Sequence, residues 1–279
     1  MDKTNELLFD LKNKVKLSVQ DLVLCALSKS GFFDKAVLHG EKARRIHYEL
    51  DGFSGHLEFS LMEPDVAFSM DSLLSSLQQE FAALSLNLQS EIREKPERSN
   101  VHSVVLKGNT KELFVTLFKD KKKSKYIPDS DMVNVRFEVN VVPSKYAGYC
   151  RKKYVSLEAF EVTLYDKPSL FAEKIANTIV RAWKSRTKGC DLYDYAFYHS
   201  NNVAVNFKHL VTRLMDLNYI EAKEDMTLEE VKITLCNRFR EINYEQTKID
   251  LLPFMNDPEA LEVWSTEYFC GITQDLTIE

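Results

Sequence analysis

Glycine is scarce in this sequence: only 8 of the 279 residues are glycine, against an average usage of about 7% in proteins. Two glycine-rich strings are absent, G-x-G-x-x-G and G-x-x-x-x-G-K-[ST]. They bind the phosphates of dinucleotides and, in P-loop proteins, of nucleoside triphosphates. We therefore expect neither a classical dinucleotide-binding fold nor a P-loop NTPase.

Paired cysteines and long apolar runs are also missing. No C-x-x-C pair occurs among the five cysteines, so neither a disulfide framework nor a zinc ribbon is supported. No apolar run approaches the roughly 18 residues of a membrane span, and the first residues do not resemble a signal peptide. A net charge of −5 excludes a broadly basic surface but not a local basic patch. We expect a cytoplasmic protein without a membrane-spanning segment.

The first part of the chain mixes helical and strand patterns. Apolar residues recur at three- and four-residue steps over 7–27 and again over 73–92, which predicts two amphipathic helices. Between them, 36–38 reads as a short strand followed by a helix to Tyr48, and 57–61 alternates like a half-buried strand. The order is helix, strand, helix, strand, helix.

Three β-like segments follow, at 101–107, 112–118 and 133–142, and the turn-forming Gly108-Asn109 joins the first two. The third is the clearest strand, because valine and phenylalanine alternate with polar residues along it. We predict one more strand over 154–165.

No convincing strand follows Pro168, whereas two helix starts do: a capping box at Thr227 and Asp257-Pro258. The sequence thus predicts an α+β domain over residues 1–166 and a helical bundle domain over 167–279.

Basic and amide side chains recur at helical spacing after residue 168, which places them on one face of a helix: Lys174, Asn177, Arg181, Lys184 and Lys188. Such a face is usually solvated, but it also fits a phosphate-binding ridge. We expect Gly189 to end the helix, with Asp191 and Asp194 on one face of the next. Those two carboxylates equally fit an N-cap and a first-turn acid.

A second group of ionisable residues lies near the predicted strand 57–61. His56 and Glu58 point to one side of it, and Glu138 on the later strand could join them. Such a group could hold a divalent cation or transfer protons, although a histidine–glutamate pair is often just a polar strand face. Magnesium prefers oxygen ligands, so His56 would weaken its binding or favour another metal.

The segment Ala36 to Ser60 resembles the first motif of the AbiEii/AbiGii-type abortive-infection toxins, a branch of the nucleotidyltransferase superfamily. There a Gly-Gly-Ser/Thr turn precedes a segment reading roughly R-F-S-E-D-L-D-F. The corresponding residues here are His39-Gly40-Glu41 and Gly52-Phe53-Ser54-Gly55-His56-Leu57-Glu58-Phe59. The second half matches better, because the family's Glu-Lys pair, later arginine and K-D-L-Y-D-like string correspond to Glu173-Lys174, Arg181 and Lys188-Gly189-Cys190-Asp191-Leu192-Tyr193-Asp194.

The resemblance implies a nucleotidyltransferase-like mixed sheet flanked by helices. It also implies transfer of a nucleotide from a nucleoside triphosphate to an acceptor such as tRNA, with Mg²⁺ or Mn²⁺ as cofactor, and a cognate antitoxin protein as a further partner. The implied metal ligands, which would also be catalytic, are His56, Glu58 and Glu138. The implied nucleotide-binding residues, of which Lys174 would also be catalytic, are Gly40, Glu41, Lys174, Arg181, Asp191 and Asp194.

Three residues depart from the family pattern. Glu41 replaces a small hydroxyl residue and would repel a triphosphate, and His56 replaces the first metal-binding aspartate. His39 replaces the first glycine, which we expect to remove a positive φ and a close backbone approach. The alternative hypothesis is therefore a catalytically degenerate homologue that binds a nucleotide, RNA or protein.

A cluster of lysines lies at 119–125. The string Lys119-Asp120-Lys121-Lys122-Lys123-Ser124-Lys125 reads as a solvated loop that could contact RNA phosphates. A helical interaction module joined to an unrelated α+β domain is a third hypothesis, which applies if the resemblance is accidental.

Overall fold

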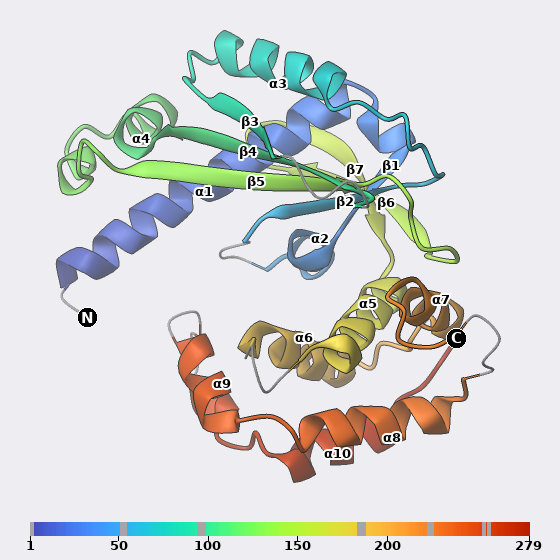
Figure 1. Ribbon diagram of the computed structural model, residues 1–279. Coiled ribbons are helices and arrows are strands. Elements are labelled where there is room, and N and C mark those ends of the chain that lie inside the picture. The colour runs from blue at the N-terminus through green and yellow to red at the C-terminus, as the bar shows by residue number, and fades with distance from the viewer. Residues whose placement is uncertain are drawn as a thin grey trace. The chain divides into compact units, whose positions relative to one another are not determined.

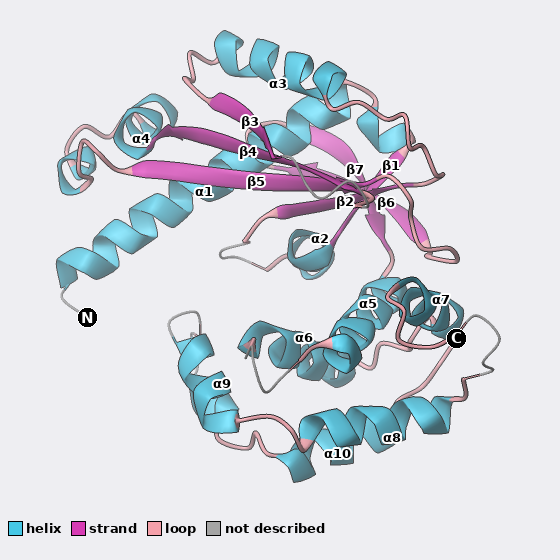
Figure 2. Cartoon of the chain, in the orientation of Figure 1, coloured by secondary structure: helices cyan, strands magenta, loops and turns pink. Residues whose placement is uncertain are grey.

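A computed structural model describes residues 3–50, 55–93, 99–182, 188–221, 226–252, 255 and 258–279. The chain divides into two compact units, one of Met1–Pro143 with Tyr149–Tyr165 and one of Ser144–Gly148 with Asp166–Glu279. The named strands all belong to the first unit, and the second consists mainly of helices (Figure 2).

The first unit is built on a seven-stranded sheet in the order β3-β4-β5-β2-β1-β7-β6. The pairs β1–β7 and β2–β5 are parallel, and the other neighbours are antiparallel. The fold is therefore the α+β arrangement with a mixed sheet that the sequence predicts. The strands are β1 (Ala36–His39), β2 (Leu57–Leu61), β3 (Gln89–Arg93), β4 (Val101–Asn109), β5 (Met132–Asn140), β6 (Tyr149–Val155) and β7 (Ala159–Tyr165).

The predicted alternation along β5 is confirmed. Val135, Phe137 and Val139 are fully buried, whereas Arg136 and Glu138 between them remain partly exposed. Phe137 contacts Phe59 of β2 edge to face, with ring centroids 6.5 Å apart. One face of the central strands thus belongs to the apolar core, and the opposite face carries the polar side chains.

Helices pack around this sheet. The long helix α1 runs diagonally across it in Figure 1 and contacts β5, β7, α3 and α4. Its predicted apolar stripe is confirmed, because Val15, Val19 and Val23 are fully buried. The helices of the first unit are α1 (Lys3–Lys29), α2 (Gly40–Tyr48), α3 (Asp71–Ala83) and α4 (Thr110–Phe118), with short 3-10 turns η1 (Phe32–Asp34) and η2 (Lys123–Tyr126).

The prediction of a strand over 112–118 is wrong, because this segment is helix α4. Gly108 and Asn109 do not form a hairpin turn but extend β4, where they pair with Val133 and Met132. The Asn109 side chain then accepts a hydrogen bond from the Glu112 N–H at 3.0 Å, so the same asparagine caps the helix.

Two further boundaries differ from expectation. The helix predicted over 73–92 ends at Ala83, and Gln89–Arg93 forms the edge strand β3. That strand is mostly exposed, so it lacks the apolar alternation that sequence reading depends on. The strand predicted over 154–165 is an antiparallel hairpin in which Val155 pairs with Ala159.

The second unit contains helices α5 (Lys167–Val180), α6 (Gly189–Ser200), α7 (Phe207–Asp216), α8 (Leu228–Phe239), α9 (Tyr244–Leu251) and α10 (Thr266–Gln274). Its core includes Tyr195, Phe239 and Phe269, which are fully buried and in mutual aromatic contact. The capping box at Thr227 is present. Pro258 begins a 3-10 turn, η4 (Pro258–Leu261), while its expected cap, Asp257, lies outside the described residues.

Candidate functional site

A polar row crosses the centre of the sheet in register. His39 of β1 pairs with Glu58 of β2, Glu58 pairs with Glu138 of β5, and Glu138 pairs with Ser103 of β4. Directly paired residues on neighbouring strands point to the same face and lie about 5 Å apart. The sheet therefore places the two glutamates side by side, although 80 residues of sequence separate them.

The Glu58 carboxylate lies close to His56 and Gly40. Its Oε1 atom lies 3.3 Å from Nε2 of His56. On its other side it lies against Gly40, since a Cβ built at position 40 would be 1.9 Å from Glu58 Oε2. The Glu58 carboxylate, although it belongs to β2, therefore lies beside the first residue of α2. There the helix dipole and the first backbone N–H groups favour a negative charge.

The turn at the start of α2 depends on Gly40 alone for its positive φ. Gly40 has φ of 71°, whereas His39 is extended with φ of −132°. His39 therefore has no positive φ, as expected of a residue that replaces glycine, and the turn keeps its positive φ at position 40. The His39 ring instead stacks on Tyr165, with centroids 5.1 Å apart, and its Nε2 lies 3.3 Å from Ser60 Oγ.

Two hydrogen bonds hold the Glu41 carboxylate within the first unit. Its Oε1 accepts a hydrogen bond from Arg45 at 3.0 Å, and its Oε2 accepts one from the Gly55 N–H at 3.3 Å. The arginine offsets part of the negative charge that we expected to repel a triphosphate. The first-motif residues Gly52, Phe53 and Ser54 lie outside the described residues.

A divalent metal is the group that the family resemblance implies for these side chains. Within the described ranges, no three side chains of His, Cys, Asp or Glu are grouped closely enough to hold one ion, so His56, Glu58 and Glu138 do not form such a group. The paired glutamates nevertheless fit magnesium, which proteins often bind through one or two carboxylates together with substrate phosphates. Arg136 Nε, 4.0 Å from Glu138 Oε1, adds a positive charge beside them.

The second unit holds a separate buried ionic cluster. Lys174 Nζ lies 2.7 Å from Asp194 Oδ2 and 3.9 Å from Asp191 Oδ1. Arg181 pairs with Asp191, and Lys188 Nζ lies 3.8 Å from the same carboxylate. The side chains of Asp191 and Asp194 are 1% and 3% exposed, so both carboxylates depend on these cations for compensation.

The pKa values of two side chains in this region, Lys174 and Cys190, are raised. Burial by itself would lower the pKa of Lys174, but the Asp194 and Asp191 carboxylates outweigh it and raise that pKa well above its usual value. Burial, followed by the Asp191 charge, raises the pKa of the Cys190 thiol to about 11. Lys174 therefore remains charged, and Cys190 stays a neutral thiol at physiological pH.

The cluster does not arise from the predicted helix face. Helix α5 ends at Val180, and Arg181 is already in an extended conformation. Lys184 lies outside the described residues, and Gly189 begins α6 instead of ending α5. The basic residues converge because the first turn of α6 brings Asp191 to them.

A second ionic group, centred on Glu173, was not predicted. Its carboxylate lies 3.3 Å from His209 Nε2 and 3.2 Å from Arg213 Nε, which joins α5 to α7. His209 is fully buried, and its Nδ1 contacts the Lys145 carbonyl at 2.9 Å. The spacing of His209 and Arg213, one helical turn apart, was the available signal.

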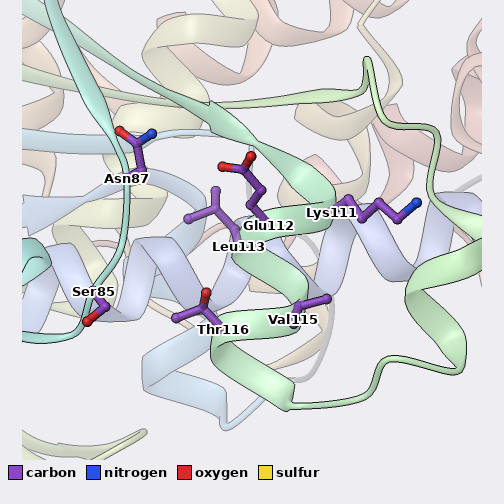
Figure 3. A pocket seen from close by; sticks show the side chains of 7 residues that line it. All are labelled: Ser85, Asn87, Lys111, Glu112, Leu113, Val115 and Thr116. Atoms are coloured by element: carbon purple, nitrogen blue, oxygen red, sulfur yellow. The ribbon is translucent and has the colours of Figure 1, made fainter.

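A cavity of about 420 Å³ lies elsewhere on the first unit. Its walls come from α4 and from the segment after α3, and Glu112 and Lys111 are among the side chains around it (Figure 3). Lys111 is paired with Asp129 at 2.6 Å. Neither Glu58 nor Glu138 lines this cavity, so we do not assign the site to it.

Comparison with known proteins identifies the family. Residues 22–269 match the family described as nucleotidyl transferase AbiEii toxin, type IV TA system. The chain belongs to this family. The matched range includes Gly40, Glu58, Glu138 and the Lys174 cluster, and it supports the resemblance seen in the sequence. No curated protein sequence matches the chain significantly.

Two solved structures similar to this chain are JHP933 from Helicobacter pylori and the nucleotidyltransferase toxin MenT4 from Mycobacterium tuberculosis H37Rv. JHP933 is 14% identical with a TM-score of 0.47, and the alignment covers 93% of this chain and 89% of JHP933. MenT4 is 12% identical with a TM-score of 0.46, and the alignment covers 95% of this chain and 94% of MenT4.

Throughout the described part of the chain, every helix is too short or too polar to span a bilayer.

Proposed function

We propose that this chain transfers a nucleotide from a nucleoside triphosphate to an RNA acceptor, with Mg²⁺ or Mn²⁺ as cofactor. Membership of a nucleotidyl transferase family supports the reaction class. The choice of tRNA as the acceptor comes from the sequence resemblance. The observation that carries the proposal is the register that pairs Glu58 with Glu138 on one face of the sheet.

In this proposal Glu58 and Glu138 hold the metal, and His56 orients the Glu58 carboxylate from 3.3 Å. The bound metal supplies positive charge that offsets the charge of the phosphates. Because Gly40 carries no Cβ and adopts a positive φ, the Glu58 carboxylate, and a metal that it holds, would lie against the start of α2, where substrate phosphates would also bind. Glu41, which Arg45 and the Gly55 N–H hold, fixes the shape of that turn.

We propose that Lys174 and Arg181 also bind phosphate, with Asp191 and Asp194 setting their positions. An ammonium group has three N–H donors, so the 2.7 Å contact with Asp194 does not exhaust Lys174. The paired aspartates keep Lys174 charged, and a charged lysine binds phosphate as a point charge. Phosphoryl transfer depends mainly on such positioning and charge neutralisation.

The direct test is incubation of the full chain with each labelled nucleoside triphosphate, magnesium or manganese, and total RNA. We expect label to appear in RNA with at least one nucleotide. Absence of transfer under every combination of metal, nucleotide and RNA would overturn the proposal.

Specific contacts also favour a second candidate, a degenerate homologue that binds without catalysis. Glu41 occupies the phosphate-binding turn, and Lys174 is already paired with two carboxylates. Calorimetry with nucleoside triphosphates and magnesium separates the two candidates. Binding without any transfer supports the degenerate homologue. If the native protein turns over and Glu41→Ser with His56→Asp is no better, the degeneracy hypothesis is wrong.

The family assignment also bears on protein partners. The matching family is described as the toxin of a type IV toxin–antitoxin system. We propose that a cognate antitoxin protein exists for this chain. Growth arrest on expression of the native chain, relieved by a co-expressed neighbouring gene product, would support this pairing.

A further inference from the structure

Five lysines lie close together in the loop after α4, and we call Lys119, Lys121, Lys122, Lys123 and Lys125 the basic lobe. All five side chains are exposed. None of their ammonium groups makes an ion pair or hydrogen bond with any residue that the structure describes. Lysines elsewhere in the unit, such as Lys42 and Lys107, are paired with carboxylates.

Neighbouring carboxylates do not neutralise the positive charge of the basic lobe. Asp129 is paired with Lys111 at 2.6 Å, and Asp131 is paired with Lys12 at 2.7 Å. Asp120 lies within the loop, where its carboxylate accepts hydrogen bonds from two backbone N–H groups and offsets only one of the five lysine charges. On a chain with a net charge of −5, this surface therefore carries a concentrated positive charge.

Hydrogen bonds within the loop hold the backbone of the basic lobe in a defined conformation. Asp120 Oδ1 accepts from the Lys122 and Lys123 N–H groups at 3.1 and 2.9 Å. Ser124 Oγ donates to the Lys121 carbonyl at 3.1 Å, and Ser124 and Ile127 are buried. A backbone held in this way loses little further freedom when a ligand binds.

An aromatic ring stands beside the charges. Tyr126 is 52% exposed and follows Lys125 directly, in the 3-10 turn η2. Lysines that neutralise phosphates next to an exposed ring are the combination that single-stranded nucleic acids bind. Protein–protein interfaces are instead depleted in lysine.

We propose that the basic lobe binds the sugar–phosphate backbone of single-stranded RNA and that Tyr126 stacks on a base. The inference rests on the proposed function only in taking RNA as the acceptor. The lobe supplies affinity without sequence preference, because phosphate contacts position a nucleic acid but do not read it.

The test measures the affinity for a short fluorescein-labelled oligouridylate over a series of salt concentrations. For single-stranded nucleic acids, each neutralised phosphate contributes about 0.7 to the slope of log affinity against log salt. Lys121→Gln with Lys123→Gln should therefore lower that slope by roughly 1.4 and weaken binding at physiological salt. Both substitutions leave the backbone hydrogen bonds of the loop in place.

The matched control is Lys145→Gln with Lys153→Gln, which removes the same charge from two other exposed lysines. It should leave the slope within error of the native value. Tyr126→Ala should weaken binding by roughly 5-fold or more without changing the slope, since it removes stacking but no charge. Melting temperatures confirm that every variant is folded.

The outcome that overturns the inference is an unchanged slope and affinity in the lobe variant, or equal losses in the control. The inference is also overturned if the lobe lysines are needed for binding to poly-glutamate or to phosphatidylserine-containing vesicles but not for binding to oligouridylate. Lobe-dependent RNA binding without nucleotide transfer supports the lobe and counts against the proposed function. Nucleotide transfer together with RNA binding that does not depend on the lobe supports the proposed function and counts against the lobe.

Discussion

The Glu58 carboxylate lies directly against Gly40, so that a Cβ at position 40 would be 1.9 Å from Glu58 Oε2. Gly40 also has φ of 71°, which other residues adopt at a cost. The close contact and the backbone conformation therefore depend on the same glycine, at the end of the strand that pairs with β2.

The first prediction concerns this glycine. Gly40→Ala should lower the free energy of unfolding by more than about 1 kcal/mol, because it adds backbone strain and displaces Glu58. Two alanine controls separate the causes: Gly31 has φ of 73° with only a 3.5 Å contact, and Gly55 has no neighbour within 4 Å. Denaturant titration should rank the losses as Gly40, then Gly31, then Gly55. Equal losses at Gly40 and Gly31 would show that the Glu58 contact contributes nothing.

The second prediction concerns the buried pair Lys174 and Asp194. Lys174→Met should cost about 3–5 kcal/mol of unfolding free energy, because it leaves buried carboxylates without their cation. Lys174→Met with Asp194→Leu should recover part of that loss, since both charges of the pair are then gone. If the double variant is as unstable as the sum of the single variants, the pair is not coupled. Loss of activity in a Lys174 variant must therefore be read beside its stability.

The pH dependence of that pair has a definite sign. Because the folded pKa of Lys174 is raised, its contribution to stability is fully present below its unfolded pKa of about 10.4 and is lost as pH rises through the folded value. The stability difference between the native chain and Lys174→Met should stay constant from neutral pH to about 10 and shrink above that. A difference that already shrinks near pH 8 would contradict the raised pKa.

The third prediction concerns Cys190. Burial and the Asp191 charge raise the pKa of its thiol to about 11, and the thiolate is the form that alkylating reagents attack. The alkylation rate, followed by mass spectrometry of the Cys190 peptide, should keep rising with pH up to about 11. The urea-unfolded chain should level off near the ordinary cysteine pKa of about 8.5. A plateau near that lower pH in the folded protein would contradict the shift.

The fourth prediction concerns the cap of α4. Asn109→Ala should lower the free energy of unfolding by about 1 kcal/mol, because the Glu112 N–H loses its acceptor. Asn109→Asp should retain most of the stability, since a carboxylate caps equally well. Its remaining deficit reflects the lost Asn109 Nδ2 hydrogen bond to the Asp129 carbonyl, which is 2.6 Å long, together with the repulsion between that carbonyl and the new carboxylate oxygen. An alanine variant as stable as the aspartate variant would argue against the cap.

The sequence predicted β5 and α1 well. Apolar residues alternate along β5 with the two-residue period of a strand, and they recur along α1 with the period of a helix. The prediction failed at 112–118, where a short apolar run fits both helix and strand and where Gly108-Asn109 resembles a hairpin turn. The structure resolves the ambiguity through pairing of Asn109 with Met132 and through its cap on α4. Pairing across the chain is not visible in a local pattern.

The candidate site was predicted in part. Spacing alone placed His56 and Glu58 on one side of a strand, but only the parallel register of β2 with β5 brings Glu138 beside Glu58. The ion pairs of Lys174 and Arg181 with Asp191 depend on where α5 ends and α6 begins. Helical periodicity carries no information about such a break between helices.

The central claim is that Glu58 and Glu138 serve nucleotide transfer together. The most direct measurement is transfer of label from a nucleoside triphosphate to RNA by the native chain, Glu58→Gln, Glu138→Gln and the control Glu161→Gln. Glu161 is an exposed carboxylate on β7 of the same sheet. We predict that the first two variants remain folded and lose at least about 10- to 100-fold in rate, the loss already seen when a partner of a metal ligand is removed, while Glu161→Gln keeps the native rate. Native rates in both Glu58→Gln and Glu138→Gln, or no transfer by the native chain, would contradict the account.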